Sequence, residues 1–141
     1  MVDFVGAGCG APDLITVRGM RLLEAADVII YAGSLVNPQL LDYAKEGCEI
    51  HNSAYMTLDE VISVMEKAEK SGLHTVRLHT GDPCLYGAIR EQTDRLDSLG
   101  IKYDICPGVS SFCGAAAALR AEYTLPDISQ TVIITRMAGR T

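Results

Sequence analysis

Two glycine-bearing turns organise the chain: Val5-Gly6-Ala7-Gly8-Cys9-Gly10-Ala11-Pro12 and His79-Thr80-Gly81-Asp82-Pro83-Cys84-Leu85-Tyr86-Gly87. Each turn follows a short apolar run typical of a buried strand and precedes a segment with helical periodicity. Turns of this kind lie at the carboxyl ends of parallel strands, where they form one wall of a ligand cleft. The two turns together therefore predict a binding site in an α/β domain.

The rest of the chain alternates between strand and helix patterns without repeats or linkers. Strands are expected around residues 2–5, 28–31, 48–50, 75–78, 101–106 and 132–134, and helices around residues 12–23, 38–44, 57–71, 89–99 and 110–119. The clearest helix start is the capping box Thr57-x-x-Glu60. About six strands with crossover helices predict an α/β fold with a mostly parallel sheet flanked by helices.

Composition narrows the functional classes. The 141 residues carry a net charge of -6, which argues against a general nucleic-acid binder. The five cysteines, Cys9, Cys48, Cys84, Cys106 and Cys113, have no metal-ligand spacing, so we expect reduced thiols, no metal site and a cytoplasmic location. Cys84 and Cys113 are expected to be small buried residues. No basic leader or membrane-length apolar run is present in the sequence.

The first turn also fits the loose dinucleotide pattern Gly6-x-Gly8-x-x-Ala11. The second apolar run, however, ends at Tyr31-Ala32-Gly33 without the acidic residue that would bind a ribose. Asp13 would oppose a pyrophosphate at the start of the following helix. A dinucleotide site and a purely structural tight turn are both kept as alternatives.

Three motifs together resemble the tetrapyrrole methylase family: Gly6-Ala7-Gly8-Cys9-Gly10-Ala11-Pro12-Asp13-Leu14-Ile15-Thr16, Gly81-Asp82-Pro83-x-x-Tyr86-Gly87 and Pro107-Gly108-Val109-Ser110-Ser111. Three further stretches, Tyr31 to Val36, Tyr86 to Gln92 and Ser129 to Arg136, are similar to the members that methylate carbon 11 of the macrocycle in cobalamin biosynthesis. This chain departs from the family pattern at Cys9, where proline is usual, and at Ala11, where aspartate is usual.

The resemblance implies an S-adenosylmethionine-dependent methyltransferase that acts on a tetrapyrrole. It also implies a two-domain homodimer, of which residues 1–141 are the amino-terminal domain, with the cofactor held between the domains. The cofactor-binding residues that it implies are Cys9, Gly81, Asp82, Leu85, Ser110, Ser111 and Met137. It implies no identified catalytic residue, no metal, no membrane and no nucleic-acid partner. We also expect Arg77, Arg136 and Arg140 to face the carboxylates of the substrate.

Several alternatives stay open. Other family members, which methylate uroporphyrinogen, diphthine or ribosomal RNA, share the cofactor turns. The chain could also bind the cofactor without being a complete catalyst. Asp82 could simply cap its own turn, and Ser110 could be only the N-cap of the alanine-rich helix. His79 is expected to be structural rather than catalytic.

Overall fold

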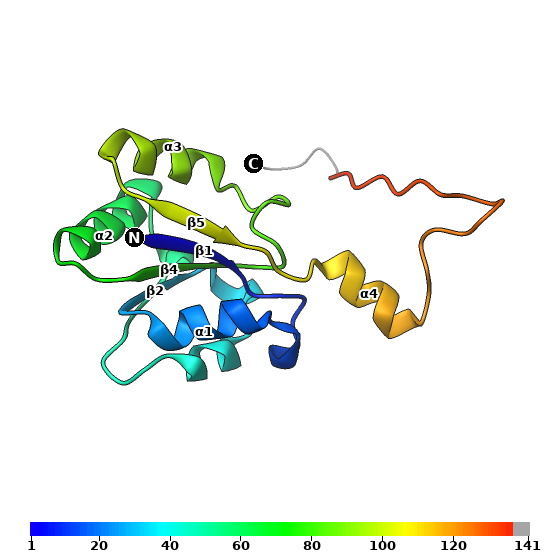
Figure 1. The fold of residues 1–141 in the computed structure, drawn as a ribbon, viewed down its shortest axis with the longest axis horizontal. Coiled ribbons are helices and arrows are strands. Elements are labelled where there is room, and N and C mark those ends of the chain that lie inside the picture. Colours follow the sequence, from blue (N-terminus) through cyan, green and yellow to red (C-terminus); the bar gives the residue numbers. More distant parts are fainter. Residues whose placement is uncertain (137–141) are drawn as a thin grey trace.

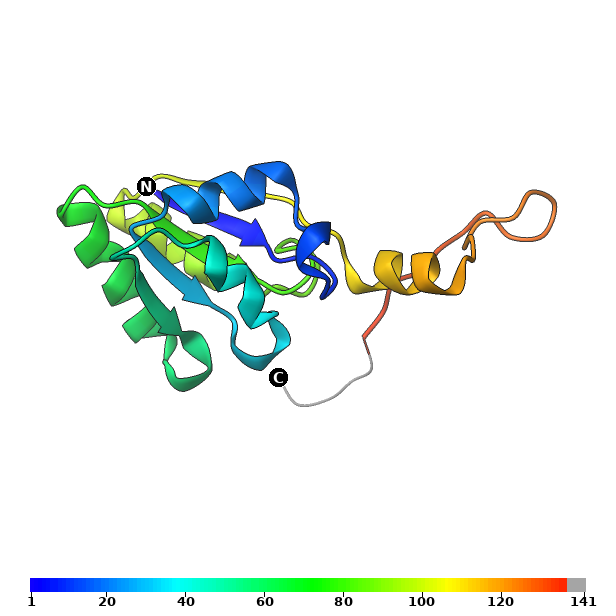
Figure 2. The same cartoon turned by 90° about the horizontal axis from the view of Figure 1, so that it is seen from below.

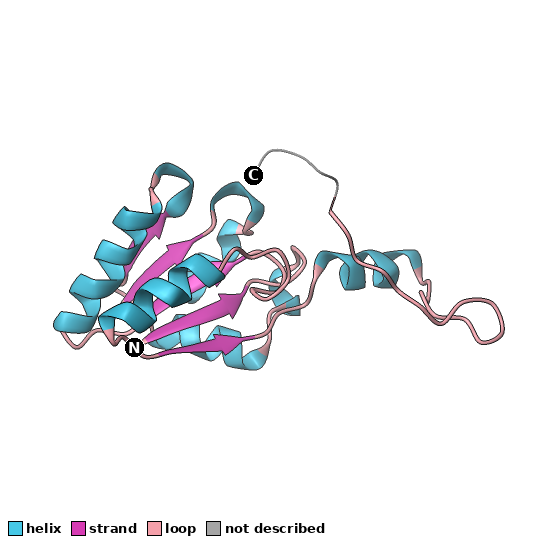
Figure 3. Cartoon of the chain, turned by 90° about the horizontal axis from the view of Figure 1, so that it is seen from above, coloured by secondary structure: helices cyan, strands magenta, loops and turns pink. Residues whose placement is uncertain are grey.

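The computed structural model describes residues 1–136, and its centre is a five-stranded parallel sheet. The strands are β1 (Val2–Gly6), β2 (Val28–Tyr31), β3 (Glu49–Asn52), β4 (Thr75–His79) and β5 (Tyr103–Cys106). They lie in the order β3-β2-β4-β1-β5, and Figure 3 shows all five arrows pointing the same way. The predicted α/β fold with a parallel sheet is confirmed. The strand order differs from the 3-2-1-4-5-6 order of the dinucleotide-binding fold.

Helices cover both faces of the sheet (Figure 1). The α-helices are α1 (Val17–Ala25), α2 (Leu58–Lys70), α3 (Arg90–Leu99) and α4 (Ser111–Leu119). The short 3-10 helices are η1 (Pro12–Leu14), η2 (Gly33–Leu35), η3 (Pro38–Tyr43) and η4 (Ser53–Tyr55). One face packs against α1 and η3, the other against α2 and α3. Among residues 1–136, none of these helices is long and apolar enough to cross a membrane.

Strands β1 and β2 each supply both halves of the core because successive side chains point to opposite faces. Phe4 packs in the cluster under α2 and α3, whereas its neighbour Val5 packs in the cluster with Leu23 of α1. Ile29 and Ile30 divide in the same way. This two-sided burial explains why β2 is a continuous apolar run rather than an alternating pattern.

Local capping sets the helix boundaries. The capping box between Thr57 and Glu60 is present, as predicted. The single helix expected over residues 12–23 is instead two elements, η1 and α1. The break occurs at Thr16, whose extended backbone ends the first turn and whose hydroxyl accepts a hydrogen bond from the N–H of Gly19. Gly100 ends α3 in the left-handed conformation, as its position predicted.

The prediction of a strand at residues 132–134 was wrong, so the sheet within residues 1–136 has five strands rather than six. Residues 131–136 form no described strand and run back beside α4, beyond the sheet (Figure 1). Ile133 is 81% exposed there. An apolar β-branched run favours extended backbone, but it becomes a strand only where a sheet edge lies next to it.

Candidate functional site

A cavity lies at the carboxyl ends of the neighbouring strands β1 and β4, whose following helices lie on opposite faces of the sheet. The loop after β1 leads to α1 on one face, and the loop after the neighbouring β4 leads to α3 on the other. Two adjacent strands whose following helices diverge leave a crevice at their carboxyl ends, which is where open α/β sheets bind ligands. Figure 2 shows α4 and the returning segment beyond this end of the strands.

Three loops meet backbone to backbone on this crevice. The N–H of Gly8 donates to the carbonyl of Gly81 at 3.2 Å, and the N–H of Gly81 donates to the carbonyl of Gly8 at 3.0 Å. A Cβ on Gly108 would lie 2.1 Å from the oxygen of Gly81, and one on Gly6 would lie 2.5 Å from the Cα of Gly108. Glycine is therefore required at these crossings because no side chain fits between the loops.

A cavity of about 640 Å³ opens beside these crossings, a size typical of small-molecule sites. Its lining residues come from five segments: Gly8, Cys9, Gly10, Leu35, Thr80, Gly81, Asp82, Leu85, Tyr86, Ser110, Ser111, Phe112, Ile134, Thr135 and Arg136. The lining combines apolar side chains with hydroxyls and backbone groups. Such a surface suits an amphipathic ligand.

The structure brings six of the seven predicted cofactor residues into this one cavity: Cys9, Gly81, Asp82, Leu85, Ser110 and Ser111. Met137 lies outside the described residues. Sequence reasoning did not assign lining roles to Leu35, Tyr86 or Phe112. Leu35 and Tyr86 stand in the quoted motif stretches, and Phe112 directly follows one, so adjacency to the motifs was the available signal.

Asp82 ties two loops together. Its Oδ1 accepts a hydrogen bond from the N–H of Cys84 at 2.8 Å, and its Oδ2 accepts one from the N–H of Gly108 at 2.9 Å. The turn-capping alternative for Asp82 is thus present in the structure. Each oxygen can accept a further hydrogen bond and Asp82 lines the cavity, so contact with a ligand stays a prediction.

Ser110 stands at the N-cap position of α4, but its hydroxyl makes no capping hydrogen bond. Ser110 is therefore the N-cap residue, as that alternative expected, although its side chain does not cap the helix, and its contact with a ligand stays a prediction. The first N–H groups of an α-helix have no partner within the helix, and the first turn of α4 supplies Ser111 and Phe112 to the lining. Hydrogen-bond donors are thus available at this side of the cavity.

The loop between β4 and α3 holds an unusual backbone shape. Tyr86 and Ala88 have φ angles of 57° and 50°, in the left-handed region that non-glycine residues seldom adopt. A Cβ on Gly87 between them would lie 2.1 Å from the oxygen of Pro83. The Tyr86 hydroxyl donates to the carbonyl of Ile134 at 3.5 Å and so joins this loop to the returning segment.

The cysteines fall into different environments. Cys9 packs on α4, because a Cβ on Gly114 would lie 2.7 Å from both the Cβ and the Sγ of Cys9. Cys84 and Cys113 are exposed, so the expectation of two buried thiols was wrong. No group of three potential metal-ligating side chains occurs within residues 1–136.

The expectation that three arginines face the substrate has a different outcome for each of them. Arg77 is buried under α3 and cannot face a substrate, since β4 is an interior strand and Arg77 points to a covered face. Arg136 lines the cavity, and Arg140 lies outside the described residues.

His79 is buried against Phe4, and its Nε2 has no hydrogen-bond partner. Burial, together with the charge of Arg77, lowers the pKa of His79 to about 3, so the ring is neutral near pH 7.

Comparison with known proteins gives concordant results. The family model of the tetrapyrrole (corrin/porphyrin) methylases matches this sequence over residues 1–141. The cobalt-precorrin-4 C(11)-methyltransferase of Methanocaldococcus jannaschii is 60% identical over 140 residues, which is 99% of this chain and 54% of that protein. The X-ray structure of a cobalamin biosynthetic enzyme, cobalt-precorrin-4 methyltransferase, superposes with a TM-score of 0.95 at 49% identity, over 99% of this chain and 58% of that one.

A third structure carries a ligand. It is uroporphyrin-III C-methyltransferase from Thermus thermophilus in complex with S-adenosylhomocysteine, with a TM-score of 0.74, 27% identity and coverage of 92% of this chain and 52% of that one. The chain therefore spans little more than half the length of these proteins.

Proposed function

Because the chain belongs to the tetrapyrrole (corrin/porphyrin) methylase family, we propose that it is the cofactor-binding part of a methyltransferase that acts on carbon 11 of precorrin-4 or cobalt-precorrin-4 in cobalamin biosynthesis. The support is the 60% identity to the methyltransferase of Methanocaldococcus jannaschii over nearly all of the chain. The uroporphyrinogen-III C-methyltransferase of Bacillus subtilis is 39% identical over 127 residues, and this lower identity makes that other branch of the family the weaker alternative.

The cavity at the carboxyl ends of β1 and β4 is the observation on which the cofactor proposal rests. It has the size for S-adenosylmethionine and joins apolar side chains to glycine backbone and to the hydroxyls of Ser110 and Ser111. The cofactor contains no phosphate, in agreement with glycine turns that have no lysine beside them. When bound, it supplies a methyl group that its sulfonium makes electrophilic.

The contribution of the protein is alignment. Methyl transfer to carbon is an in-line displacement, and holding the reactants in register can contribute about 7–11 kcal/mol. The backbone crossings at Gly6, Gly81 and Gly108 form a wall that cannot yield without breaking main-chain contacts. Cys9 and Leu85 would position the cofactor from two sides of this wall.

The substrate would enter beside the returning segment. Arg136, at the cavity, would bind a carboxylate of the tetrapyrrole, in which many carboxylates surround the ring. The overall charge of -6 makes such a local cation useful, because the rest of the surface repels an anionic substrate.

The complete enzyme would be a cytoplasmic homodimer with a second domain that completes the cavity. Two observations support this part of the proposal. The related proteins are nearly twice as long as the aligned region. Large apolar side chains are exposed on and after α4, notably Leu119, Ile128 and Ile133, and patches of this kind mark protein contacts.

Calorimetric titration of S-adenosylhomocysteine into the 141-residue chain tests the cofactor site. Micromolar binding at one ligand per chain is the expected result. The matched measurement uses a chimera in which this chain is followed by the remainder of the Methanocaldococcus jannaschii relative. Absence of binding to the chimera would contradict the proposed function, whereas binding to the chimera alone would assign an essential part of the site to the second domain.

A further inference from the structure

A row of polar side chains lies inside the apolar core on the α2/α3 face of β4. Thr75, Arg77 and His79 alternate along this interior strand, and all three are buried. Core positions of a parallel strand are normally apolar. The proposed function does not use this row, so its presence calls for a separate explanation.

Arg77 is held by neutral acceptors. It is 7% exposed, its Nε donates to the Oε1 of Gln92 at 3.1 Å, and its Nη1 donates to the carbonyl of Ile30 at 3.1 Å. The ion pairs among residues 1–136 do not include Arg77. Burial lowers the pKa of Arg77 to about 10, which still leaves it cationic near pH 7. A buried cation without a carboxylate is unfavourable, so a structural demand must offset its presence.

Gln92 extends this contact to the next loop. The side chain is 6% exposed in the first turn of α3, and its Nε2 donates to the carbonyl of Ala88 at 3.4 Å. Three hydrogen bonds thus run from the carbonyl of Ile30 in β2, through Arg77 and Gln92, to the carbonyl of Ala88. We call this path the Ile30–Ala88 relay.

The relay ends at Ala88, in the loop that also supplies Leu85 and Tyr86 to the cavity wall. Ala88 and Tyr86 are the two non-glycine residues of the loop in the left-handed region, and such conformations persist only where the surroundings hold them. Ile89, at the N-cap position of α3, makes no side-chain capping bond, so the usual fixing device is missing at this helix start. Leu85 and Tyr86, three and two residues before Ala88, line the cavity.

We propose that Arg77 and Gln92 are positioning residues, which act through the Ile30–Ala88 relay to hold the left-handed turn and so keep Leu85 and Tyr86 in place against the cofactor. The proposal rests on the proposed function in one respect, namely that this cavity takes the cofactor. Neither residue touches the cavity itself. The buried cation serves to orient the amide of Gln92, because a guanidinium that can only donate forces the amide oxygen toward Arg77 and the amide N–H₂ toward Ala88.

Gln92→Glu separates the two halves of the relay. The carboxylate still accepts from Arg77, now as an ion pair, but it has no N–H to donate and repels the carbonyl of Ala88. Thermal stability should therefore be kept, whereas the Kd for S-adenosylhomocysteine should rise about tenfold, which equals about 1.4 kcal/mol. A role limited to satisfying Arg77 would leave the Kd unchanged.

A second readout does not depend on binding. The ¹³Cα and ¹³Cβ chemical shifts of Ala88 report its left-handed conformation, and Gln92→Glu should move them away from those values. Glu91→Gln, on the same helix turn but exposed and outside the relay, is the matched control and should change neither the Kd nor the shifts.

Two results would overturn the proposal: an unchanged Kd in Gln92→Glu, or unchanged Ala88 shifts in that variant. If the unaltered chain fails to bind S-adenosylhomocysteine, the assignment of the cavity in this chain fails by itself. The Ala88 shifts then decide the relay alone, a change in Gln92→Glu supporting it and no change refuting it.

Discussion

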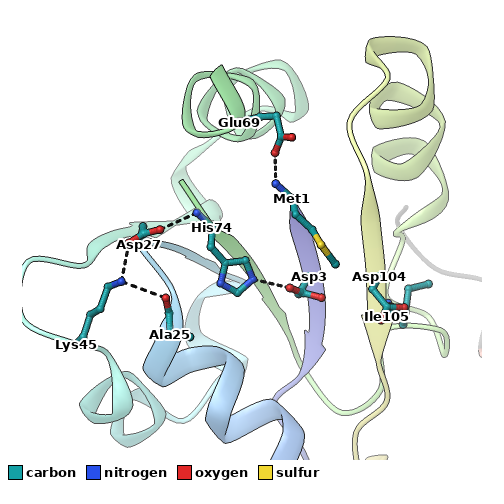
Figure 4. Close-up of polar contacts among 9 residues, drawn as sticks. All are labelled: Met1, Asp3, Ala25, Asp27, Lys45, Glu69, His74, Asp104 and Ile105. Atoms are coloured by element: carbon teal, nitrogen blue, oxygen red, sulfur yellow. Dashed lines mark hydrogen bonds and ion pairs between the residues drawn. The ribbon is translucent and has the colours of Figure 1, made fainter. Parts of the chain in front are cut away.

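The two ends of the sheet are held by different kinds of contact. At the amino end, side chains connect the strands (Figure 4): Asp27 accepts from the Nζ of Lys45 at 2.6 Å and from the N–H of His74 at 2.8 Å. Asp3 accepts from the His74 ring, and the terminal ammonium of Met1 pairs with Glu69. At the carboxyl end, the loops meet mainly through backbone atoms at glycines, and the Asp82 side chain adds one tie, to the N–H of Gly108.

The difference shows that a ligand cavity limits which contacts can hold the surrounding loops together. Side-chain ties occupy the space between elements, and at the amino end they lie away from the cavity at the carboxyl end. Backbone contacts at Gly6, Gly81 and Gly108 leave that space free for a ligand, and they fix the wall to within the size of one methyl group. The carboxyl end should therefore be intolerant of small additions, whereas the amino end should respond mainly to pH and salt.

Gly108→Ala should produce the largest effect. The added Cβ would lie 2.1 Å from the oxygen of Gly81 and 2.7 Å from the Cα of Gly6. Because both of these are backbone atoms, the loops must separate. We expect the free energy of unfolding to fall by about 3 kcal/mol, measured by urea denaturation. Gly47→Ala is the control: Gly47 has a φ of 80° in open space, so only the conformational cost of about 1 kcal/mol applies. Equal losses in the two variants would contradict the argument.

His79 should make the carboxyl end sensitive to acid. Its pKa is 6.5 when unfolded and about 3 when folded, so the unfolded chain binds the extra proton between these values. Stability from the neutral ring is complete above pH 6.5 and is lost as the pH falls toward 3, at up to about 1.4 kcal/mol per pH unit. His79→Gln should flatten this part of the stability profile. An unchanged slope in that variant would show that His79 is not the group responsible.

Gly114→Ala should separate stability from binding. Alanine favours the α4 helix by up to about 1 kcal/mol, but its Cβ would lie 2.7 Å from the Cβ and Sγ of Cys9 in the cavity wall. We expect unchanged or higher thermal stability together with roughly fivefold weaker S-adenosylhomocysteine binding, an effect of about 1 kcal/mol. Adding Cys9→Gly removes both clashing atoms and should restore the affinity. If Gly114→Ala binds as well as the unaltered chain, the contact between Cys9 and α4 does not shape the site.

Asp27→Asn should have the smallest effect and confine it to the amino end. The N–H of His74 and then the ammonium of Lys45 hold the pKa of Asp27 below its usual 3.8. The carboxylate therefore stabilises the fold above pH 3.8, and this contribution disappears as the pH falls further. The Tm difference between Asp27→Asn and the unaltered chain should shrink at low pH and at high salt. A change in S-adenosylhomocysteine affinity at pH 7 would show that the two ends are coupled.

Much of the fold could be predicted locally. The alternation of apolar runs and helical segments identified β1 to β5, and the box at Thr57 and Glu60 placed the start of α2. The errors came where local signals depend on a neighbour. Val132 to Ile134 have the composition of a strand, but no sheet edge lies beside them. Arg77 is of a residue type that is usually exposed, but it lies on an interior strand and is buried.

The sequence by itself determined the parallel α/β class, the two glycine turns and the family, because these depend on periodicity, on backbone freedom at glycine and on motif order. Tertiary structure alone decided that the turns meet through Gly8 and Gly81, that Asp82 joins two loops, and that Arg77 lies in the core beside Gln92. These facts depend on strand order, which places residues distant in the chain within hydrogen-bonding reach, and no local pattern encodes strand order.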